Sequence, residues 1–376
     1  MKKIFLMLAL LCAIVQGMKA QSGIYCTASD VGRVICTDGS IYDNVSAATA
    51  AGRTAVAKVI WIDETNKKGL ALSLQDDGQT SNIGTANSIC NGKNNSLPVD
   101  GATWKLASKD EWDKMIAGNP GALRDGFSSV GGQNMKSELY YSSTNYEYSS
   151  AYTYAYDFGE NQWETDKNGI FSVICNVRAC LEFNLLELYT IGSASDWNEF
   201  CIAVNLGHTF SDKYVKLTSN ISVSTMAGYS ETNSFQGAFD GDGKTLTFNK
   251  SDFTENYCAP FRYVGGTATI KNLRTAGTIN TTYQYAGGMV AWIVDGSNVS
   301  IKNCRSAVTI NSSNHTNGGF VSRLGDNANT KLTISGCAFD GSFEGTGHHN
   351  GGFVGYCEVG SSATFTDCLF APDHIS

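Results

Sequence analysis

Alternating apolar and polar positions recur at fixed intervals in the second half of the chain. The segments ATIKNLRTAGTI, VSIKNCRSAVTI, LTISGCAFDGSF and ATFTDCLF start at Ala268, Val299, Leu332 and Ala363, at steps of 31, 33 and 31 residues. A second motif, present as AGGMVAWI, NGGFVSRL and NGGFVGYC, repeats with it. Two motifs that recur in register indicate a repetitive architecture.

Each repeat holds three short strand-like runs, such as VSIKN, SAVTI and GGFVS, closed by Gly, Asn, Ser or Asp. This pattern predicts a right-handed parallel β-helix with one coil per 31–33 residues. Equivalent residues then stack at the strand spacing of about 4.8 Å. The glycine pairs are expected at corners, where positive φ or close packing requires them. Two inward columns are predicted, one of Ile270, Ile301, Ile334 and Phe365 and one of Leu273, Cys304, Cys337 and Cys368.

A less regular coil is expected before the repeats, from strand-like runs within 214–264. The segment SASDWNEFCIAVN (193–205) is typical of a short helix. Ser195 is expected to cap it, with Asp196 near its positive N-terminal end. Such a helix would close one end of the β-helix. The last strand ends at Phe370, so the other end is expected to be covered by further chain or by a partner.

The first half does not repeat. Strands are predicted at 53–63 and 69–76, joined by a polar turn. The segment 104–118 predicts a turn into a helix, with Ser108 and Glu111 as a capping box. Further β-like runs cover 140–144, 152–159 and 171–183, and the apolar side of the helix consists of Trp112, Met115 and Ile116.

Tyrosine is concentrated in one stretch. Seven of the 17 tyrosines lie between Tyr140 and Tyr156. Tyrosine combines a flat apolar face with a polar tip, which suits stacking on sugars and contact with proteins. The alternative is a half-buried strand whose aromatic side chains pack on the helix. The candidate ligand-binding residues are Tyr146, Tyr148, Tyr152, Tyr154 and Trp163.

The first half resembles the C-type-lectin-like domains of bacterial secreted proteins, the DUF1566 group in particular. The resemblance rests on the WKLASKDEW helix entry, YYSST, the aromatic strand before Gly159 and the closing VRAC strand. It implies a compact α+β head with two small sheets and a ligand surface within about 144–168. The Glu-Pro-Asn, Gln-Pro-Asp and Trp-Asn-Asp triplets of calcium-dependent lectins do not occur, so that chemistry is not implied.

The second half resembles the GLUG-type repeat solenoids of surface proteins and adhesins of Bacteroides-like bacteria. The segments GAFDGDGKTLTF and ATIKNL, the GGFVG-like motif and the Ile-x-x-Cys steps carry this resemblance. The expected fold is therefore mainly β, a lectin-like head followed by the β-helix. The expected divisions are a signal peptide (1–20), the C-type-lectin-like domain (21–183), a linker with the capping helix (184–212) and the β-helix (213–376).

The first 20 residues predict export. Lys2 and Lys3, an apolar run from Ile4 to Val15, and Ala20 are typical of a secretory signal peptide. An extracellular or outer-surface location is expected, with the periplasm as the alternative. The formal net charge of −8 argues against nucleic acid and anionic membranes as partners. No later apolar run approaches the roughly 20 residues that span a membrane.

Few residues point to catalysis or to a metal. Beyond residue 20 the chain has 11 cysteines, so at least one thiol is free, and a disulfide within the first domain is left open. No Cys or His spacing is typical of zinc. Asp240 and Asp242 favour a tight turn over a calcium loop. His315 and His348 should stack on adjacent coils, where a solvated turn is favoured over a metal site. No cofactor and no metal are expected.

These observations predict a secreted or cell-surface binding or adhesion protein without catalytic activity, whose lectin-like head captures glycan or protein ligands. One alternative is a carbohydrate-active enzyme, a lyase or hydrolase, with its catalytic wall on the β-helix. That requires clustered acidic or basic groups on one face, and the repeats hold few acids. The other alternative is a structural envelope protein that self-associates through the solenoid end.

Overall fold

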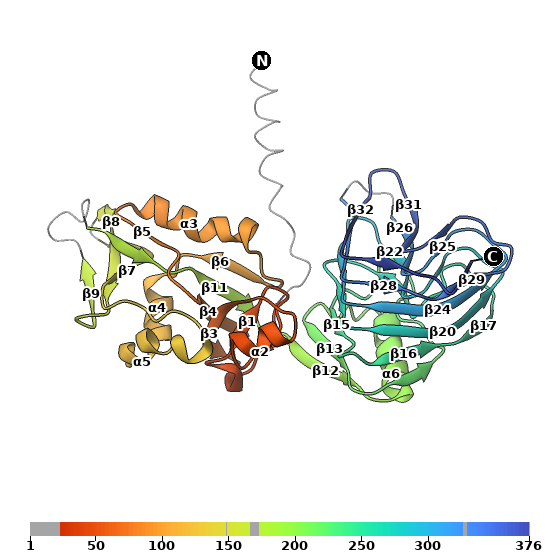
Figure 1. The fold of residues 1–376 in the computed structure, drawn as a ribbon, viewed down its shortest axis with the longest axis horizontal. Helices are drawn as coiled ribbons and strands as arrows, with labels where there is room; N and C mark the ends of the chain where they lie inside the picture. The colour runs from red at the N-terminus through yellow and green to blue at the C-terminus, as the bar shows by residue number, and fades with distance from the viewer. Residues whose placement is uncertain (1–22, 148, 166–172, 326–328, 376) are drawn as a thin grey trace, which may run out of the picture. The chain divides into compact units, whose positions relative to one another are not determined.

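The computed structural model describes residues 23–147, 149–165, 173–325 and 329–375 (Figure 1). The chain divides into two compact units, residues 22–187 and 188–376, termed the first unit and the solenoid unit. The expected leader, residues 1–20, lies outside the described residues. Among the described residues, no helix has the length and apolar character needed to cross a membrane.

Two sheets form the framework of the first unit. The six-stranded sheet is antiparallel, in the order β2-β1-β3-β4-β11-β6. The five-stranded sheet has the order β5-β10-β7-β8-β9, with β10 and β7 parallel. The strands are β1 (Val34–Cys36), β2 (Ile41–Tyr42), β3 (Ala55–Asp63), β4 (Lys68–Ser73), β5 (Gly78–Thr80), β6 (Ala102–Lys105), β7 (Leu139–Tyr146), β8 (Ser149–Asp157), β9 (Gln162–Thr165), β10 (Cys175–Val177) and β11 (Cys180–Asn184). The helices are η1 (Ala28–Asp30), α2 (Val45–Ala50), α3 (Ile83–Ser96), α4 (Lys109–Ile116), α5 (Pro120–Asp125) and η2 (Ser128–Val130).

Helix α4 begins as predicted. The Ser108 hydroxyl accepts a hydrogen bond from the backbone N–H of Glu111, and the Glu111 carboxylate accepts one from the backbone N–H of Ser108. Trp112, Met115 and Ile116 are all buried. The capping box therefore fixes the start of a helix whose apolar side completes one core of this unit.

The β-like run predicted at 171–183 divides between the two sheets. β10 pairs with β5 and β7, whereas β11 pairs with β4 and β6. Arg178 lies between these two strands, and its side chain is fully buried. A run of apolar residues does not reveal such a crossing, because both halves carry the same strand-like pattern.

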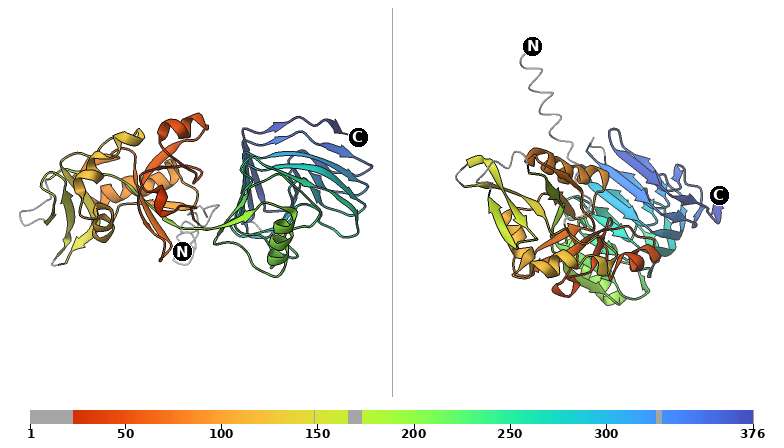
Figure 2. Two further views of the ribbon diagram at one scale, coloured as in Figure 1. Left: turned by 90° about the horizontal axis from the view of Figure 1, so that it is seen from below. Right: turned by 60° about the vertical axis from the view of Figure 1, so that its left-hand side comes forward.

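The solenoid unit is a parallel β-solenoid of about four turns, and Figure 2 shows its strands stacked coil upon coil. Its sheets have the orders β12-β13-β15-β19-β23-β27-β32, β14-β16-β20-β24-β28-β33, β18-β22-β26-β31 and β21-β25-β30, and β17, β29 and β34 join the second sheet. Its early strands are β12 (Glu187–Ile191), β13 (Lys213–Leu217), β14 (Ile221–Val223), β15 (Ala238–Asp240), β16 (Thr245–Phe248), β17 (Lys250–Phe253) and β18 (Phe261–Val264). The middle strands are β19 (Thr269–Lys271), β20 (Arg274–Thr281), β21 (Ala286–Gly287), β22 (Val290–Ile293), β23 (Asn298–Lys302), β24 (Arg305–Ser312), β25 (Asn317–Gly318) and β26 (Val321–Leu324). The last strands are β27 (Lys331–Ser335), β28 (Ala338–Phe339), β29 (Ser342–Glu344), β30 (Asn350–Gly351), β31 (Val354–Cys357), β32 (Ser362–Thr366), β33 (Leu369–Phe370) and β34 (His374–Ile375).

The predicted inward columns are confirmed for their first three members, because Ile270, Ile301, Ile334, Leu273, Cys304 and Cys337 are at most 3% exposed. Ile270, Ile301, Ile334 and Phe365 pair in register across four strands. The glycine pairs have a steric cause: a Cβ on Gly319 would lie 2.1 Å from the carbonyl oxygen of Gly352. These glycines do not have positive φ, so close packing between coils is what requires them.

Helix α6 (Ala194–Asn205) covers the end at which the solenoid begins (Figure 2). Its cap is Ser193, whose hydroxyl accepts from the backbone N–H of Asp196, so the predicted cap at Ser195 is wrong. The helix begins two residues earlier because Asp196 completes a capping box with Ser193. Trp197 and Phe200 are fully buried in the solenoid core, which confirms the predicted plug.

Candidate functional site

Four of the five predicted ligand-binding residues lie on strands of the five-stranded sheet, and the fifth lies outside the described residues. Tyr146 ends β7, Tyr154 lies on β8 and Trp163 lies on β9. Tyr148 lies outside the described residues. Tyr152 belongs to β8, but its side chain is not among those described. Three of the five can therefore be located, on three neighbouring strands.

The three located residues form a continuous chain of edge-to-face ring contacts. The ring centroids of Tyr146 and Tyr154 are 5.6 Å apart, and those of Tyr154 and Trp163 are 6.1 Å apart. All three side chains are partly exposed. The strand order β7-β8-β9 brings them together, because it places residues from three strands side by side.

Two charged residues of α4 fix the orientation of Trp163. The Lys109 Nζ lies 4.8 Å from the centre of the Trp163 ring. The indole N–H of Trp163 donates to Asp113 at 2.7 Å, and Lys109 pairs with Asp113 at 2.7 Å. These five residues, Tyr146, Tyr154, Trp163, Lys109 and Asp113, are termed the aromatic patch. The patch presents flat rings, one cation and one carboxylate. Their mutual contacts fix the geometry of the patch before any ligand binds.

Other tyrosines of the dense stretch belong to the core. Tyr140, Tyr141 and Tyr156 are all at most 5% exposed. The Tyr156 ring packs edge-to-face on Trp163 at 5.2 Å and on Phe158 at 4.8 Å. The packing alternative therefore holds for these three residues, and the partly exposed positions are Tyr146 and Tyr154.

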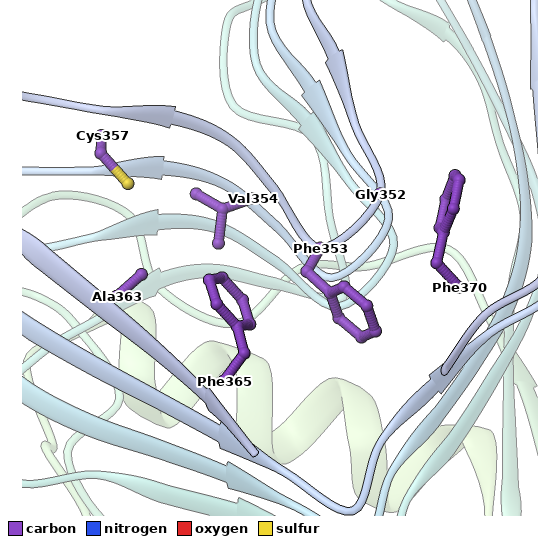
Figure 3. A pocket seen from close by; sticks show the side chains of 7 residues that line it. All are labelled: Gly352, Phe353, Val354, Cys357, Ala363, Phe365 and Phe370. Carbon is purple, nitrogen blue, oxygen red and sulfur yellow. The ribbon is translucent and has the colours of Figure 1, made fainter. Parts of the chain in front are cut away.

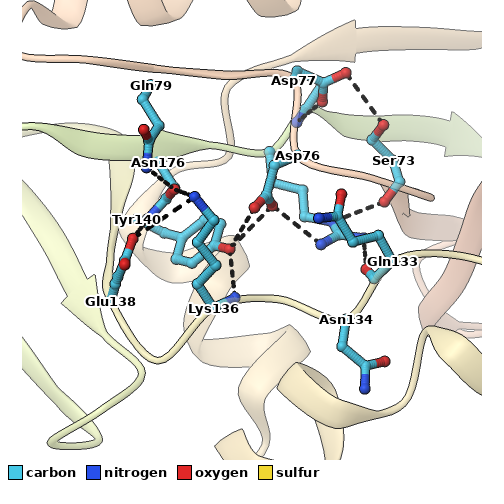
Figure 4. Close-up of polar contacts among 12 residues, drawn as sticks. Ser73, Asp76, Asp77, Gln79, Gln133, Asn134, Lys136, Glu138, Tyr140 and Asn176 are labelled. Carbon is cyan, nitrogen blue, oxygen red and sulfur yellow. Dashed lines mark hydrogen bonds and ion pairs between the residues drawn. The ribbon is translucent and has the colours of Figure 1, made fainter.

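A buried polar network lies deeper in the first unit (Figure 4). The Tyr140 hydroxyl donates to Asp76, and Arg178 pairs with the same carboxylate at 3.1 Å. Burial raises the pKa of Asp76 above its ordinary value, although Arg178 and Tyr140 oppose the shift. Arg178 also donates to the backbone carbonyls of Ser73 and Gln133. Because Arg178 bonds to the chain at and just after the end of β4 and to the Gln133 loop, it ties these two segments together.

The residues considered as candidate metal ligands contact one another or neighbouring groups. Asp240 accepts hydrogen bonds from Tyr214, Asn272 and the backbone of Asp242, which confirms a tight turn. The imidazole rings of His315 and His348 stack at 5.3 Å, as predicted. In the described part of the chain, no group of three or more His, Cys, Asp or Glu side chains is arranged to hold a metal.

The cysteines do not form the disulfide that the sequence left open. Every cysteine among the described residues is a free thiol, and most are buried. Burial raises the pKa of Cys36 to about 11 and that of Cys175 to about 11, which keeps these thiols protonated. The thiols of the first unit therefore behave as small apolar side chains.

Sequence reasoning missed a second group of large side chains, three aromatic residues and one arginine, on the solenoid unit. Tyr263, Trp292, Arg323 and Tyr356 occupy equivalent positions on four adjacent strands. They are 29–33 residues apart, and their residue types differ, so no motif joins them in the sequence. Aligning the outward positions of the repeats, rather than the inward ones alone, would have revealed them.

A cavity of about 510 Å³ opens beside the last described coil (Figure 3). Its lining includes Phe353, Val354, Phe365 and Phe370. Phe365 continues the inward column of Ile334, so this cavity lies over the interior of the last described coil. Such an apolar surface is suited to association with another β-structure.

Comparisons of this chain with protein-family models, with curated proteins and with solved structures find no match.

Proposed function

We propose that this protein is a secreted or cell-surface binding protein without catalytic activity, which captures extracellular glycans or glycoproteins. The first unit would act as a C-type-lectin-like head, and the solenoid as a stalk or a broad binding wall. The aromatic patch is the observation that carries this proposal. Its rings are partly exposed and already oriented, so a ligand would gain stacking contacts at little cost in side-chain ordering.

The carboxylates of the solenoid give less support to an enzyme. Asp340 forms an ion pair with Arg305, and Glu358 forms one with Arg323 at 2.7 Å. A glycosidase needs two carboxyl groups that face each other across the bond to be broken. These two are instead each held by an arginine, which favours structural roles for them.

A glycan array combined with a glycoprotein panel tests the proposed function. The full chain is compared with a Tyr146→Ala/Trp163→Ala variant and with Tyr42→Ala, a control on β2 in the other sheet of the same unit. Binding that the double variant loses and the control keeps supports the proposal. Binding that both variants keep, or no binding at all, contradicts it. Circular dichroism and thermal melting establish that each variant is folded.

A structural role is the second candidate, because apolar side chains are exposed on the last described coil. Phe365, Leu369 and Phe370 are 46%, 61% and 44% exposed. Sedimentation velocity over a hundredfold range of concentration would detect association through this surface. A Phe365→Ser/Leu369→Ser variant should then remain monomeric, since exposed apolar edges drive such pairing.

A further inference from the structure

The outer face of one solenoid sheet carries a column of large side chains. In β18, β22, β26 and β31, the residues Tyr263, Trp292, Arg323 and Tyr356 pair in register. The residues that follow the first three in sequence, Val264, Ile293 and Leu324, are fully buried in the core. Successive residues of a strand point to opposite faces, so the column faces away from the interior.

Two tyrosines from the neighbouring corner extend this column. The rings of Tyr257 and Tyr285 are parallel within 8° at 4.8 Å, and Tyr257 also stacks on Trp292 at 4.8 Å. Both tyrosines have left-handed backbone angles, with φ of 71° and 70°. A bulky residue is uncommon in this conformation, which glycine or asparagine adopts at less cost. Tyrosine therefore stands twice at a corner where backbone preference alone would not select it.

Arg323 joins these rings to a carboxylate. Its guanidinium lies 4.5 Å from the Trp292 ring and 5.3 Å from the Tyr285 ring. It donates to the Tyr257 hydroxyl at 2.9 Å and pairs with Glu358 at 2.7 Å. The ion pair leaves the group without net charge, while its polar atoms lie beside the rings.

These five residues, Tyr257, Tyr285, Trp292, Arg323 and Tyr356, are termed the aromatic ledge. Tyr356 is 45% exposed and the other four are partly exposed, so the ledge reaches solvent. The indole N–H of Trp292 has no hydrogen-bond acceptor among the described residues, although it is buried. An unsatisfied buried donor is costly, and an oxygen brought to it would relieve that cost.

We infer that the aromatic ledge binds a neutral, extended glycan that runs along the solenoid axis. Coils repeat at about 4.8 Å, which is close to the length of one sugar ring. Successive sugars would therefore meet equivalent positions on successive coils. The sugars would contact the partly exposed rim of the Tyr285 ring and the exposed Tyr356 ring, and their hydroxyls would reach the Arg323–Glu358 pair. Because that pair is neutral, an anionic glycan has no electrostatic advantage here.

Affinity electrophoresis of the full chain tests this inference, in gels that contain barley β-glucan, hydroxyethylcellulose, xylan or galactomannan. At least one of these neutral polysaccharides should retard the protein. The variant Tyr285→Gly/Tyr356→Ala should weaken that association about tenfold or more, as expected for the loss of two aromatic contacts. Glycine at 285 suits the left-handed backbone, so this variant should keep its fold. The matched control is Tyr283→Ala, because Tyr283 is 40% exposed and makes no ring contact with the ledge.

Three results would overturn the inference. The first is normal mobility in all four gels, and the second is undiminished retardation of the Tyr285→Gly/Tyr356→Ala variant. The third is loss of retardation in the head variant Tyr146→Ala/Trp163→Ala, which would assign the glycan to the first unit. Retardation that depends on the ledge but not on the head would support the inference even if the proposed role of the aromatic patch failed.

Discussion

Replacing Arg178 by methionine should destabilise the first unit by about 3–5 kcal/mol, the range for breaking a buried ion pair. The arginine side chain is fully buried, and that of its partner Asp76 is 11% exposed. Arg178 donates to the Ser73 carbonyl at 2.8 Å and to the Gln133 carbonyl at 2.7 Å. Its guanidinium also lies 3.9 Å from the Phe127 ring. Methionine keeps much of the packing volume but leaves one carboxylate and two carbonyls without this donor.

The variant should also change how stability depends on pH. Burial raises the pKa of Asp76 in the folded chain, and Arg178 opposes that rise. Without the arginine the folded-state pKa should rise further, so the folded variant binds a proton more readily than the unfolded chain. The stability deficit should therefore be largest at neutral pH. It should shrink as the pH falls through the raised pKa toward the ordinary value of 3.8.

Equilibrium unfolding in guanidinium chloride measures both effects. Trp104 and Trp112 are buried in the first unit, so their fluorescence follows its unfolding. The control Arg33→Met removes an arginine whose side chain is 38% exposed, and it should cost less than about 1 kcal/mol. Adding Asp76→Asn to Arg178→Met should recover part of the loss. A loss below about 1 kcal/mol, or a deficit that does not change between pH 7 and pH 4, would refute this reasoning.

Three further predictions concern the solenoid unit. A hydrogen bond from the backbone N–H of Gly192 lowers the pKa of Asp196, so Asp196→Asn should destabilise the unit at neutral pH. Thermal melts should show the difference in melting temperature between variant and parent vanish as the pH falls below the ordinary aspartate pKa. Gly319→Ala should cost at least about 1–3 kcal/mol in urea unfolding, because its new Cβ would lie 2.1 Å from the Gly352 carbonyl oxygen; a neutral effect would contradict the close-packing argument. Brief iodoacetamide labelling of the native protein, mapped by mass spectrometry, should modify the exposed Cys357 and leave the buried cysteines unlabelled until denaturant is added.

The solenoid could be predicted because the same pattern of apolar and polar residues repeats in each coil. Each inward position must match its neighbours above and below, so Ile301 and Ile334 fall at a constant interval. Parallel in-register pairing turns this interval directly into contact. The cap of α6 was harder, because Ser193 and Ser195 are both good capping residues. Only the position of Asp196, three residues after Ser193, distinguishes them.

The first unit was less predictable, because its elements are each present once. Helix α3 (Ile83–Ser96) was not predicted, since it carries little apolar periodicity and buries fully only Ala86 and Cys90. Its start is fixed by Asn82, which accepts from the backbone N–H of Thr85. The aromatic patch was located in part, through Tyr146, Tyr154 and Trp163. The role of Lys109 depends on the packing of α4 against β9, which no local pattern encodes.

The aromatic rings beneath α6 make the two ends of the solenoid unequal in the order of folding. Trp197 and Phe200 interlock with Phe239 and Phe261, with ring centroids 5.0–6.5 Å apart. Each later coil contacts mainly the coil before and the coil after it, as in other stacked repeats. Because the largest aromatic cluster lies beneath α6, folding should begin at this end. It should then advance one coil at a time. Amide hydrogen exchange should record this order as protection that declines steadily from β15 to β32.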